Sequence, residues 1–192
     1  MLASITPLGE RGRRSNWRVT VSAFLLAATA AGAAAGALLG ALGAVALPAH
    51  PRLAVLLVAI AVALVLDGLP RSVPGPRRQV DERWLDEYRG WVYGAGYGAQ
   101  LGLGVTTVVS SAATYVALLA AFLTASAPAG AGILGCYGAL RGLTPLAAAG
   151  VRSERQLLAF HRGLARWRTR ARWGGMLAQA GVLVAALVLA SP

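Results

Sequence analysis

The chain has 192 residues, of which 57% are hydrophobic and 13% are charged. A soluble domain usually carries about 25% charged residues. The deficit suits a bilayer-embedded chain, because each charge in hydrocarbon costs about 2.5 kcal/mol or more. The net charge is +11, and all 18 basic residues are arginine. These arginines lie between apolar stretches and form no nucleic-acid motif, so the charge favours a membrane surface and not nucleic acid.

Cysteine and histidine are too sparse for a metal site or a disulfide. Cys136 is the single cysteine, and His50 and His161 stand apart in separate connections. We therefore expect no metal, disulfide or other cofactor. The apolar run 19–47 is much longer than the ~7–15 residues of a signal-peptide core, which predicts a membrane span and not a signal peptide.

The first half of the chain predicts two crossings. Residues 1–18 form a basic segment that we place in the cytoplasm, and the first crossing covers about 19–47. A proline-flanked connection follows, and the second crossing covers about 53–69. That length is close to the lower limit of roughly 17 residues for a transmembrane helix.

Residues 77–93 combine charged and aromatic side chains. Val80, Trp84, Tyr88 and Trp91 follow helical spacing, which predicts an amphipathic helix at the membrane interface. A third crossing follows over about 94–124.

The last third of the chain predicts two further crossings, at about 130–149 and 174–190. Between them, 151–173 is rich in arginine and also carries one apolar stripe. The stripe consists of Leu157, Phe160, Leu164 and Trp167. This pattern predicts a second interfacial helix, whose arginines contact anionic lipid headgroups.

Together these segments predict an all-α polytopic bundle, with one transmembrane domain over 19–192. Arginines concentrate before the first crossing and in the two long connections, and positive charge stays on the cytoplasmic side. Five crossings then place the N-terminus inside and the C-terminus outside. We expect the protein in the bacterial cytoplasmic (inner) membrane.

Glycines recur at four-residue spacing in three of the predicted crossings. They are Gly32, Gly36 and Gly40; Gly94, Gly98 and Gly102; and Gly138 and Gly142. This spacing puts them on one helix face, where two backbones can approach closely. The rows predict tight packing within the bundle, with homodimerisation through the first crossing as the alternative.

The third crossing also carries a polar row. Its members are Gln100, Thr107, Ser111 and Thr114. Such a row can line a polar pathway, or it can supply hydrogen bonds between helices.

Two opposite charges occupy matching places at the ends of the second and fourth crossings. Asp67 and Arg141 are each followed by Gly-Leu and then by proline, as in a faint internal repeat of about 75 residues. We therefore predict that Asp67 and Arg141 form an intramembrane ion pair. The alternative is that each charge reaches the interface alone.

Two motifs resemble a known group of membrane proteins. They are Arg78-Gln79-Val80-Asp81-Glu82-x-Trp84 and Tyr93-Gly94-x-Gly96-Tyr97-Gly98-x-Gln100-Leu101-Gly102. This part of the chain is similar to small bacterial proteins near the cytochrome c-biogenesis and sulfite-exporter type transporters. The resemblance implies a glycine-rich, transporter-like bundle. The paired membrane cysteines of the thiol-reducing members are not matched, since only Cys136 is present.

No nucleophile–base pair, carboxylate pair or metal cluster lies in the predicted crossings, so the sequence does not predict an enzyme. We expect a transporter-like or permease-like protein for a small solute. The alternative is a membrane scaffold or accessory subunit that docks a partner through its basic cytoplasmic helix. A homo-oligomer or a membrane partner subunit is compatible with either.

Overall fold

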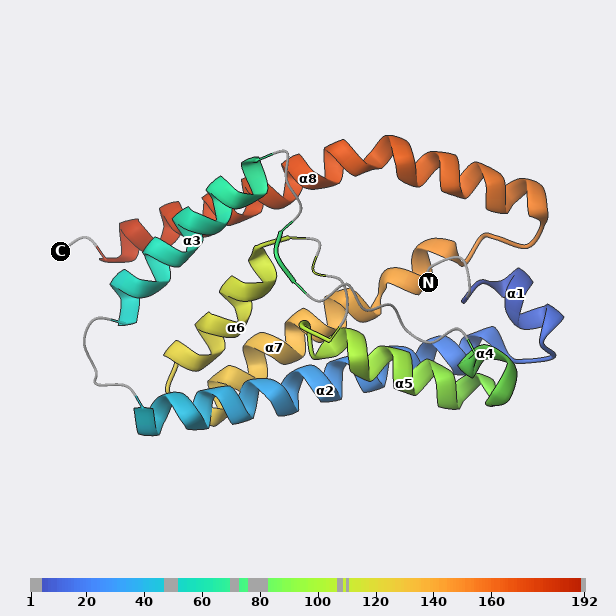
Figure 1. The fold of residues 1–192 in the computed structure, drawn as a ribbon, viewed down its shortest axis with the longest axis horizontal. Helices are drawn as coiled ribbons and strands as arrows, with labels where there is room; N and C mark the ends of the chain where they lie inside the picture. The colour runs from blue at the N-terminus through green and yellow to red at the C-terminus, as the bar shows by residue number, and fades with distance from the viewer. Residues whose placement is uncertain are drawn as a thin grey trace.

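The computed structural model describes residues 5–46, 52–69, 73–75, 83–106, 109 and 111–190. These residues form helices and connections without a strand (Figure 1), which confirms the all-helical fold class. In chain order the elements are α1 (Pro7–Gly12), α2 (Trp17–Ala46), α3 (Arg52–Gly68), α4 (Trp84–Glu87), α5 (Gly90–Gly102), α6 (Ala113–Leu123), α7 (Ala127–Gly142), the 3-10 helix η1 (Thr144–Ala148) and α8 (Glu154–Ala190). Two of them are long and apolar enough to cross a membrane: α2, and α8 over Glu154–Val188.

Helix α2 is the axis of the fold. It packs against α5, α6 and α7, whereas α3 packs between α6 and α8. Figure 1 accordingly shows α2, α5 and α7 running side by side, with α6 leaning from this layer toward α3 and α8.

Glycine allows the α2 layer to pack backbone against backbone. An added Cβ on Gly36 would lie 2.0 Å from the carbonyl oxygen of Gly130 on α7. A Cβ would come within 3.0 Å of a facing backbone oxygen at Gly32, Gly40, Gly94, Gly98, Gly102 and Gly138. At Gly142 it would lie 2.8 Å from the Leu25 side chain. The rows on α2 therefore face α7, and the row on α5 faces α2.

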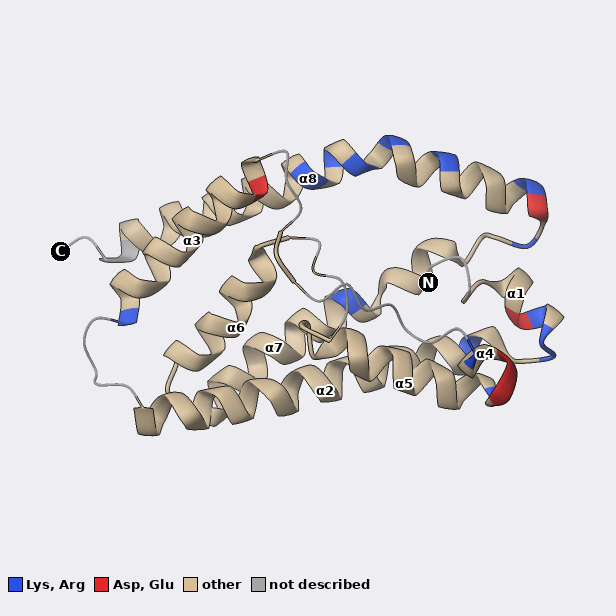
Figure 2. Cartoon of the chain, viewed as in Figure 1, with Lys and Arg blue, Asp and Glu red and all other residues tan. Residues whose placement is uncertain are grey.

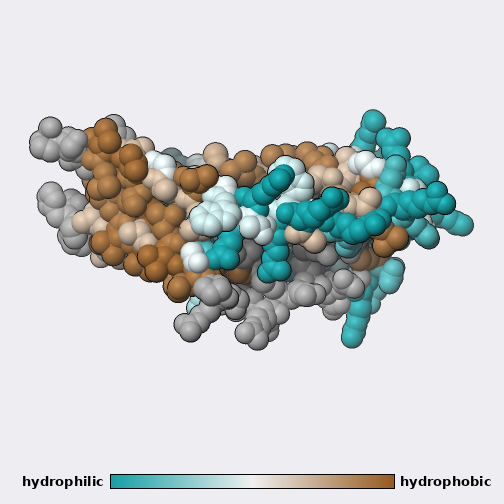
Figure 3. All heavy atoms as spheres, turned by 90° about the horizontal axis from the view of Figure 1, so that it is seen from above, coloured by the Kyte–Doolittle hydropathy of each residue, from teal (hydrophilic) through white to brown (hydrophobic). Residues whose placement is uncertain are grey.

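Charge and hydropathy separate along the length of the molecule. Charged residues gather around α1, α4 and the first half of α8 (Figure 2), and the opposite end carries Arg52. From above, the same division appears as a hydrophobic end and a hydrophilic end (Figure 3). An aromatic cluster that includes Phe24, Tyr93 and Tyr97 is buried at the charged end.

The predicted third crossing, 94–124, is wrong as a single helix. Helix α5 ends at Gly102, and α6 begins only at Ala113. Gly104 has a φ of +80°, a left-handed conformation that favours glycine and ends a right-handed helix. In addition, the Thr106 hydroxyl donates to the Gln100 carbonyl, which a continuing helix would bond to the N–H of Gly104.

The two predicted interfacial helices also differ from the structure. In the described part of 77–93, α4 covers Trp84–Glu87 and α5 begins at Gly90, while 77–82 lie outside the described residues. Residues 154–173 and the predicted crossing 174–190 form one helix, α8, and residues 151–153 precede it. The two parts of α8 differ in hydropathy, but the helical backbone continues through Gly174 and Gly175. No proline and no C-terminal capping motif ends the helix there.

Candidate functional site

The interruption between α5 and α6 meets a carboxylate from another helix. Asp67, one residue before the end of α3, accepts hydrogen bonds from the Ser111 hydroxyl at 2.7 Å and the Ala112 N–H at 2.8 Å. The first N–H groups of a helix have no partner within the helix, and Ala112 has no side chain that could cap α6. Asp67 therefore acts as the N-terminal cap of α6, supplied from α3.

Helix α8 joins the same site. The Gln179 side chain donates to the Asp67 carboxylate at 2.8 Å through Nε2, while Gln179 Oε1 is buried without a hydrogen-bond partner among the described residues. Asp67, Ser111 and Gln179 therefore bring polar groups from three segments to one place in apolar surroundings.

Arg172 closes the end of α3 from α8. Its guanidinium donates to the carbonyl oxygens of Asp67 at 2.9 Å, Gly68 at 2.8 Å and Leu69 at 2.9 Å. The last carbonyl groups of a helix lack partners within the helix, and a cation is favoured at that end. Arg172 thus acts as a C-terminal cap of α3, beside the cap that Asp67 provides for α6.

A second polar chain links α6 and α7. Thr114, which is buried, shares a hydrogen bond of 2.8 Å with the Tyr137 hydroxyl. Arg141 donates to the same hydroxyl at 2.6 Å, and its guanidinium lies 5.4 Å from the centre of the Tyr137 ring. Arg141 is therefore occupied within its own helix, one turn from Tyr137.

The predicted ion pair between Asp67 and Arg141 is wrong. Asp67 binds Ser111, Ala112 and Gln179, whereas Arg141 binds Tyr137, and no ion pair joins Asp67 and Arg141. The two predicted span ends resemble each other in sequence, but the partners of Asp67 come from other segments, whereas the partner of Arg141 lies on its own helix.

The predicted polar row does not follow one helix face either. Gln100 lies on α5 before the interruption, Ser111 reaches Asp67, and Thr114 reaches Tyr137. Thr107 lies outside the described residues. The interruption separates these side chains into the Asp67 site and the Tyr137 chain.

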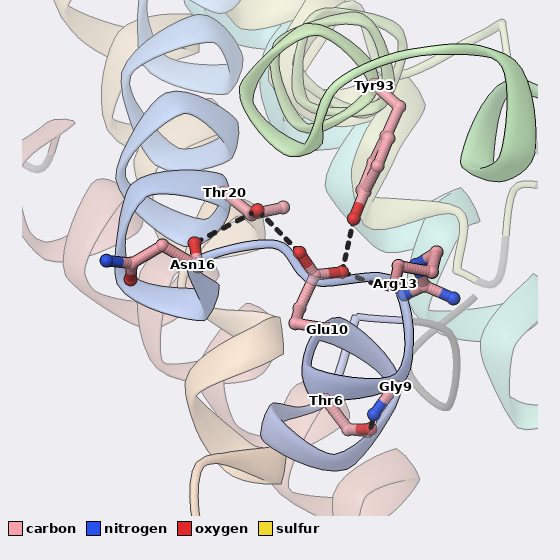
Figure 4. Close-up of polar contacts among 7 residues, drawn as sticks. All are labelled: Thr6, Gly9, Glu10, Arg13, Asn16, Thr20 and Tyr93. Carbon is pink, nitrogen blue, oxygen red and sulfur yellow. Dashed lines mark hydrogen bonds and ion pairs between the residues drawn. The ribbon is translucent and has the colours of Figure 1, made fainter.

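Sequence reasoning missed a buried carboxylate near the N-terminus. Glu10 on α1 is 0% exposed and accepts from the Thr20 hydroxyl at 2.7 Å and from Arg13 at 2.8 Å (Figure 4). The Tyr93 hydroxyl of α5 also donates to it. Glu10 therefore ties the N-terminal segment to α2 and α5.

The ion pair between Glu10 and Arg13 is partly shielded from water. Burial alone would lower the pKa of Arg13, but its hydrogen bonds to Glu10 and Tyr93 raise that pKa above its usual value. The i, i+3 spacing of Glu10 and Arg13 could have predicted their ion pair. The contacts of Glu10 with Thr20 on α2 and Tyr93 on α5 could not be predicted from neighbouring residues.

The first half of α8 is an exposed basic arm, which we define as residues 154–171. Trp167 is 61% exposed and Leu164 is 40% exposed, whereas Leu157 and Phe160 are half-buried, so the bundle leaves the second half of the predicted apolar stripe uncovered. The arm's arginines are Arg155, Arg162, Arg166, Arg168 and Arg170, all of them exposed.

No family model, curated protein or solved structure matches the chain.

Proposed function

We propose that the chain is a five-crossing membrane protein that acts as a permease for a small polar solute. The crossings are α2, α3, α5 together with α6, α7, and the second half of α8. Helix α3 has 17 residues, or about 25 Å, and the part of α8 after Arg172 has a similar length. These lengths approach the ~30 Å thickness of the hydrocarbon layer.

The apolar surfaces of α3 and α8 support this placement. Leu177, Val184 and Val188 on α8 are 71%, 59% and 66% exposed, and Val58 and Val65 on α3 are 63% and 65% exposed. A soluble monomer rarely leaves an apolar surface of this extent in contact with water. Lipid would cover it.

The charged end supports the orientation. The N-terminal segment around α1 and the basic arm carry most of the described arginines, and they lie toward the same end of the molecule (Figure 2). Positive charge is retained in the cytoplasm, so the N-terminus would be inside and the C-terminus outside.

One observation carries the permease proposal: the third crossing is interrupted beside Asp67. Transporters commonly place their sites where a membrane helix is broken, because the freed backbone groups can bind solute or ions. Here the Ala112 N–H, the Ser111 hydroxyl and the Gln179 Nε2 meet at one carboxylate, and Gln179 Oε1 has no hydrogen-bond partner among the described residues. The resemblance to sulfite-exporter type transporters agrees with this function.

Single-cysteine labelling tests the permease without knowledge of its solute. In a Cys136→Ala background, Ser111→Cys places a thiol at the interruption. A membrane-impermeant thiol reagent added to intact and to everted membranes should label it from one side, because a solute path must admit water. Leu177→Cys, on the exposed apolar face of α8, should stay unlabelled, and Ser153→Cys should label from the cytoplasmic side. An unlabelled Ser111→Cys from both sides would remove the permease.

The second candidate is a membrane scaffold, which the exposed basic arm favours. The arm carries five exposed arginines, and the hydrogen bonds of α8 to α3 lie beyond it, at Arg172 and Gln179. An acidic partner protein would fit that charge. The scaffold predicts an inaccessible Ser111→Cys, together with loss of a stoichiometric partner when Arg162, Arg166 and Arg170 are changed to glutamine.

A further inference from the structure

An open basic pocket lies at the N-terminal end of α2, on the far side of the fold from the polar groups of the permease site. Its volume is about 730 Å³, and α1, the start of α2 and the segment after η1 surround it. Four arginines line it: Arg11, Arg14, Arg18 and Arg152. Ser15, Asn16 and Trp17 complete its polar wall, and no acidic residue contributes to its lining.

No carboxylate among the described residues lines this pocket to neutralise its positive charge. The ion pair of Arg13 with Glu10 lies outside the pocket lining. The guanidinium groups of the four pocket arginines make no hydrogen bond or ion pair within the described part of the chain. Four like charges around one cavity repel one another unless an anion joins them.

The pocket is held open by contacts that leave its arginines unused. Glu10 engages Arg13 and Thr20 on the opposite side of the N-terminal segment, which fixes α1 against α2. The Leu8 N–H donates to the Val151 carbonyl at 3.2 Å, and this bond brings Arg152 to α1. The backbone that carries the four arginines is therefore in place before a ligand arrives.

The start of α2 adds to the attraction. An α-helix presents unpaired N–H groups and a partial positive charge at its N-terminus, and α2 has 30 residues. The Arg18 N–H, in the first turn of α2, donates to the Asn16 side chain at 3.0 Å, so the helix contributes mainly its partial positive charge. This charge favours an anionic ligand.

We propose that this pocket binds a phosphate group. A phosphate offers several acceptor oxygens and a full negative charge, and guanidinium groups bind it through paired hydrogen bonds. The group can come from an anionic phospholipid headgroup or from a free phosphate in the cytoplasm. The site is separate from Asp67 and stands whether or not the protein is a permease.

Paired variants test the site in the purified full chain. Arg14→Gln with Arg152→Gln removes two pocket charges, and Arg166→Gln with Arg168→Gln removes two charges from the basic arm, so the net charge is equal. Calorimetry in neutral-lipid nanodiscs measures the binding of inorganic phosphate against chloride at matched ionic strength. A parallel arm measures how much phosphatidylglycerol each protein retains from nanodiscs that mix it with phosphatidylcholine.

The pocket variant should bind phosphate, or retain phosphatidylglycerol, about 10-fold less than the wild type, because two charge-assisted bonds are lost. The arm variant should match the wild type. Saturable inorganic phosphate binding identifies a free phosphate, and retention of phosphatidylglycerol alone identifies a lipid headgroup. The proposal is overturned if both variants lose binding equally, or if neither differs from the wild type with both probes.

A second pocket variant guards against a folding defect. Arg11→Gln with Arg18→Gln changes the other two pocket arginines, which are exposed and whose guanidinium groups have no partner among the described residues. It should reproduce the loss with an unchanged unfolding temperature in the absence of phosphate. Normal binding by this second variant would contradict a site built from all four arginines.

Discussion

The Asp67 carboxylate on α3 accepts a hydrogen bond of 2.8 Å from the backbone N–H of Ala112, at the start of α6. This contact joins residues 45 positions apart in sequence, and it adds to the one local cap of α6, the hydrogen bond of 3.1 Å from the Ala113 N–H to the Ser111 hydroxyl oxygen. An interrupted membrane helix is tolerable only where its freed backbone groups find partners. Asp67 is such a partner, so the interruption and the carboxylate depend on each other.

Asp67→Ala should lower the free energy of unfolding by about 1–3 kcal/mol, because α6 loses its cap and Ser111 and Gln179 lose an acceptor. Thermal unfolding in detergent measures the change. Asp86→Ala is the matched control, since Asp86 is exposed on α4. Equal stability of the two variants would show that Asp67 does not cap α6.

Arg172→Gln should weaken the contact between α3 and α8, because three carbonyl groups at the end of α3 lose their cation. We expect a loss of about 1 kcal/mol, since the site is exposed to solvent. The same unfolding assay measures it, with Arg168→Gln as a control one turn away on α8. If Arg168→Gln is equally harmful, general charge and not the cap explains the effect.

Gly36→Ala should destabilise the bundle by about 1–3 kcal/mol through overpacking, because the new methyl group would overlap the Gly130 carbonyl. Gly132→Ala, on α7, is a sharp control: an added Cβ there meets nothing within 4 Å. Its alanine should be neutral or slightly stabilising, because alanine favours a helix over glycine. The packing of α2 on α7 would be contradicted if both variants unfolded at the same temperature.

Part of this fold could be predicted from the sequence because the signal is local. Four-residue glycine spacing reports a close helix approach directly, and the structure has these glycines facing backbone on α2, α5 and α7. Hydropathy, by contrast, does not detect the interruption, because the sequence there contains Val105, Val108 and Val109, which are typical of a membrane span. The sequence signal for the helix end was Gly104 together with the β-branched residues beside it, since these residue types disfavour a helix.

The sequence predicted some residues of the candidate site, such as Asp67 and Ser111, but it did not predict which of them bond to each other. The resemblance of the two span ends suggested Arg141 as the partner of Asp67, whereas the partners come from α6 and α8. Glu10 was missed because Thr20 and Tyr93 lie 10 and 83 residues away. Long-range hydrogen bonds leave no periodicity in a single sequence.

Glu10→Gln should destabilise the N-terminal segment by about 2 kcal/mol, because it removes the negative charge that binds Arg13 and accepts from Thr20. Hydrogen exchange of the α1 amides, together with thermal unfolding, reports the loss. Glu154→Gln is the control, since Glu154 is exposed in the first turn of α8. Unchanged protection of α1 would show that Glu10 does not hold the segment in place.

Reporter fusions test the proposed five-crossing arrangement most directly. A reporter that is active only in the cytoplasm and one that is active only outside it are each fused after Gly75 and after the C-terminus. We expect the fusion after Gly75 to be active in the cytoplasm and the fusion after the C-terminus to be active outside it. Three crossings separate the two positions: α5 together with α6, then α7, then the second half of α8. Both fusions on the same side would contradict this arrangement, since α5 and α6 would then fail to complete a crossing.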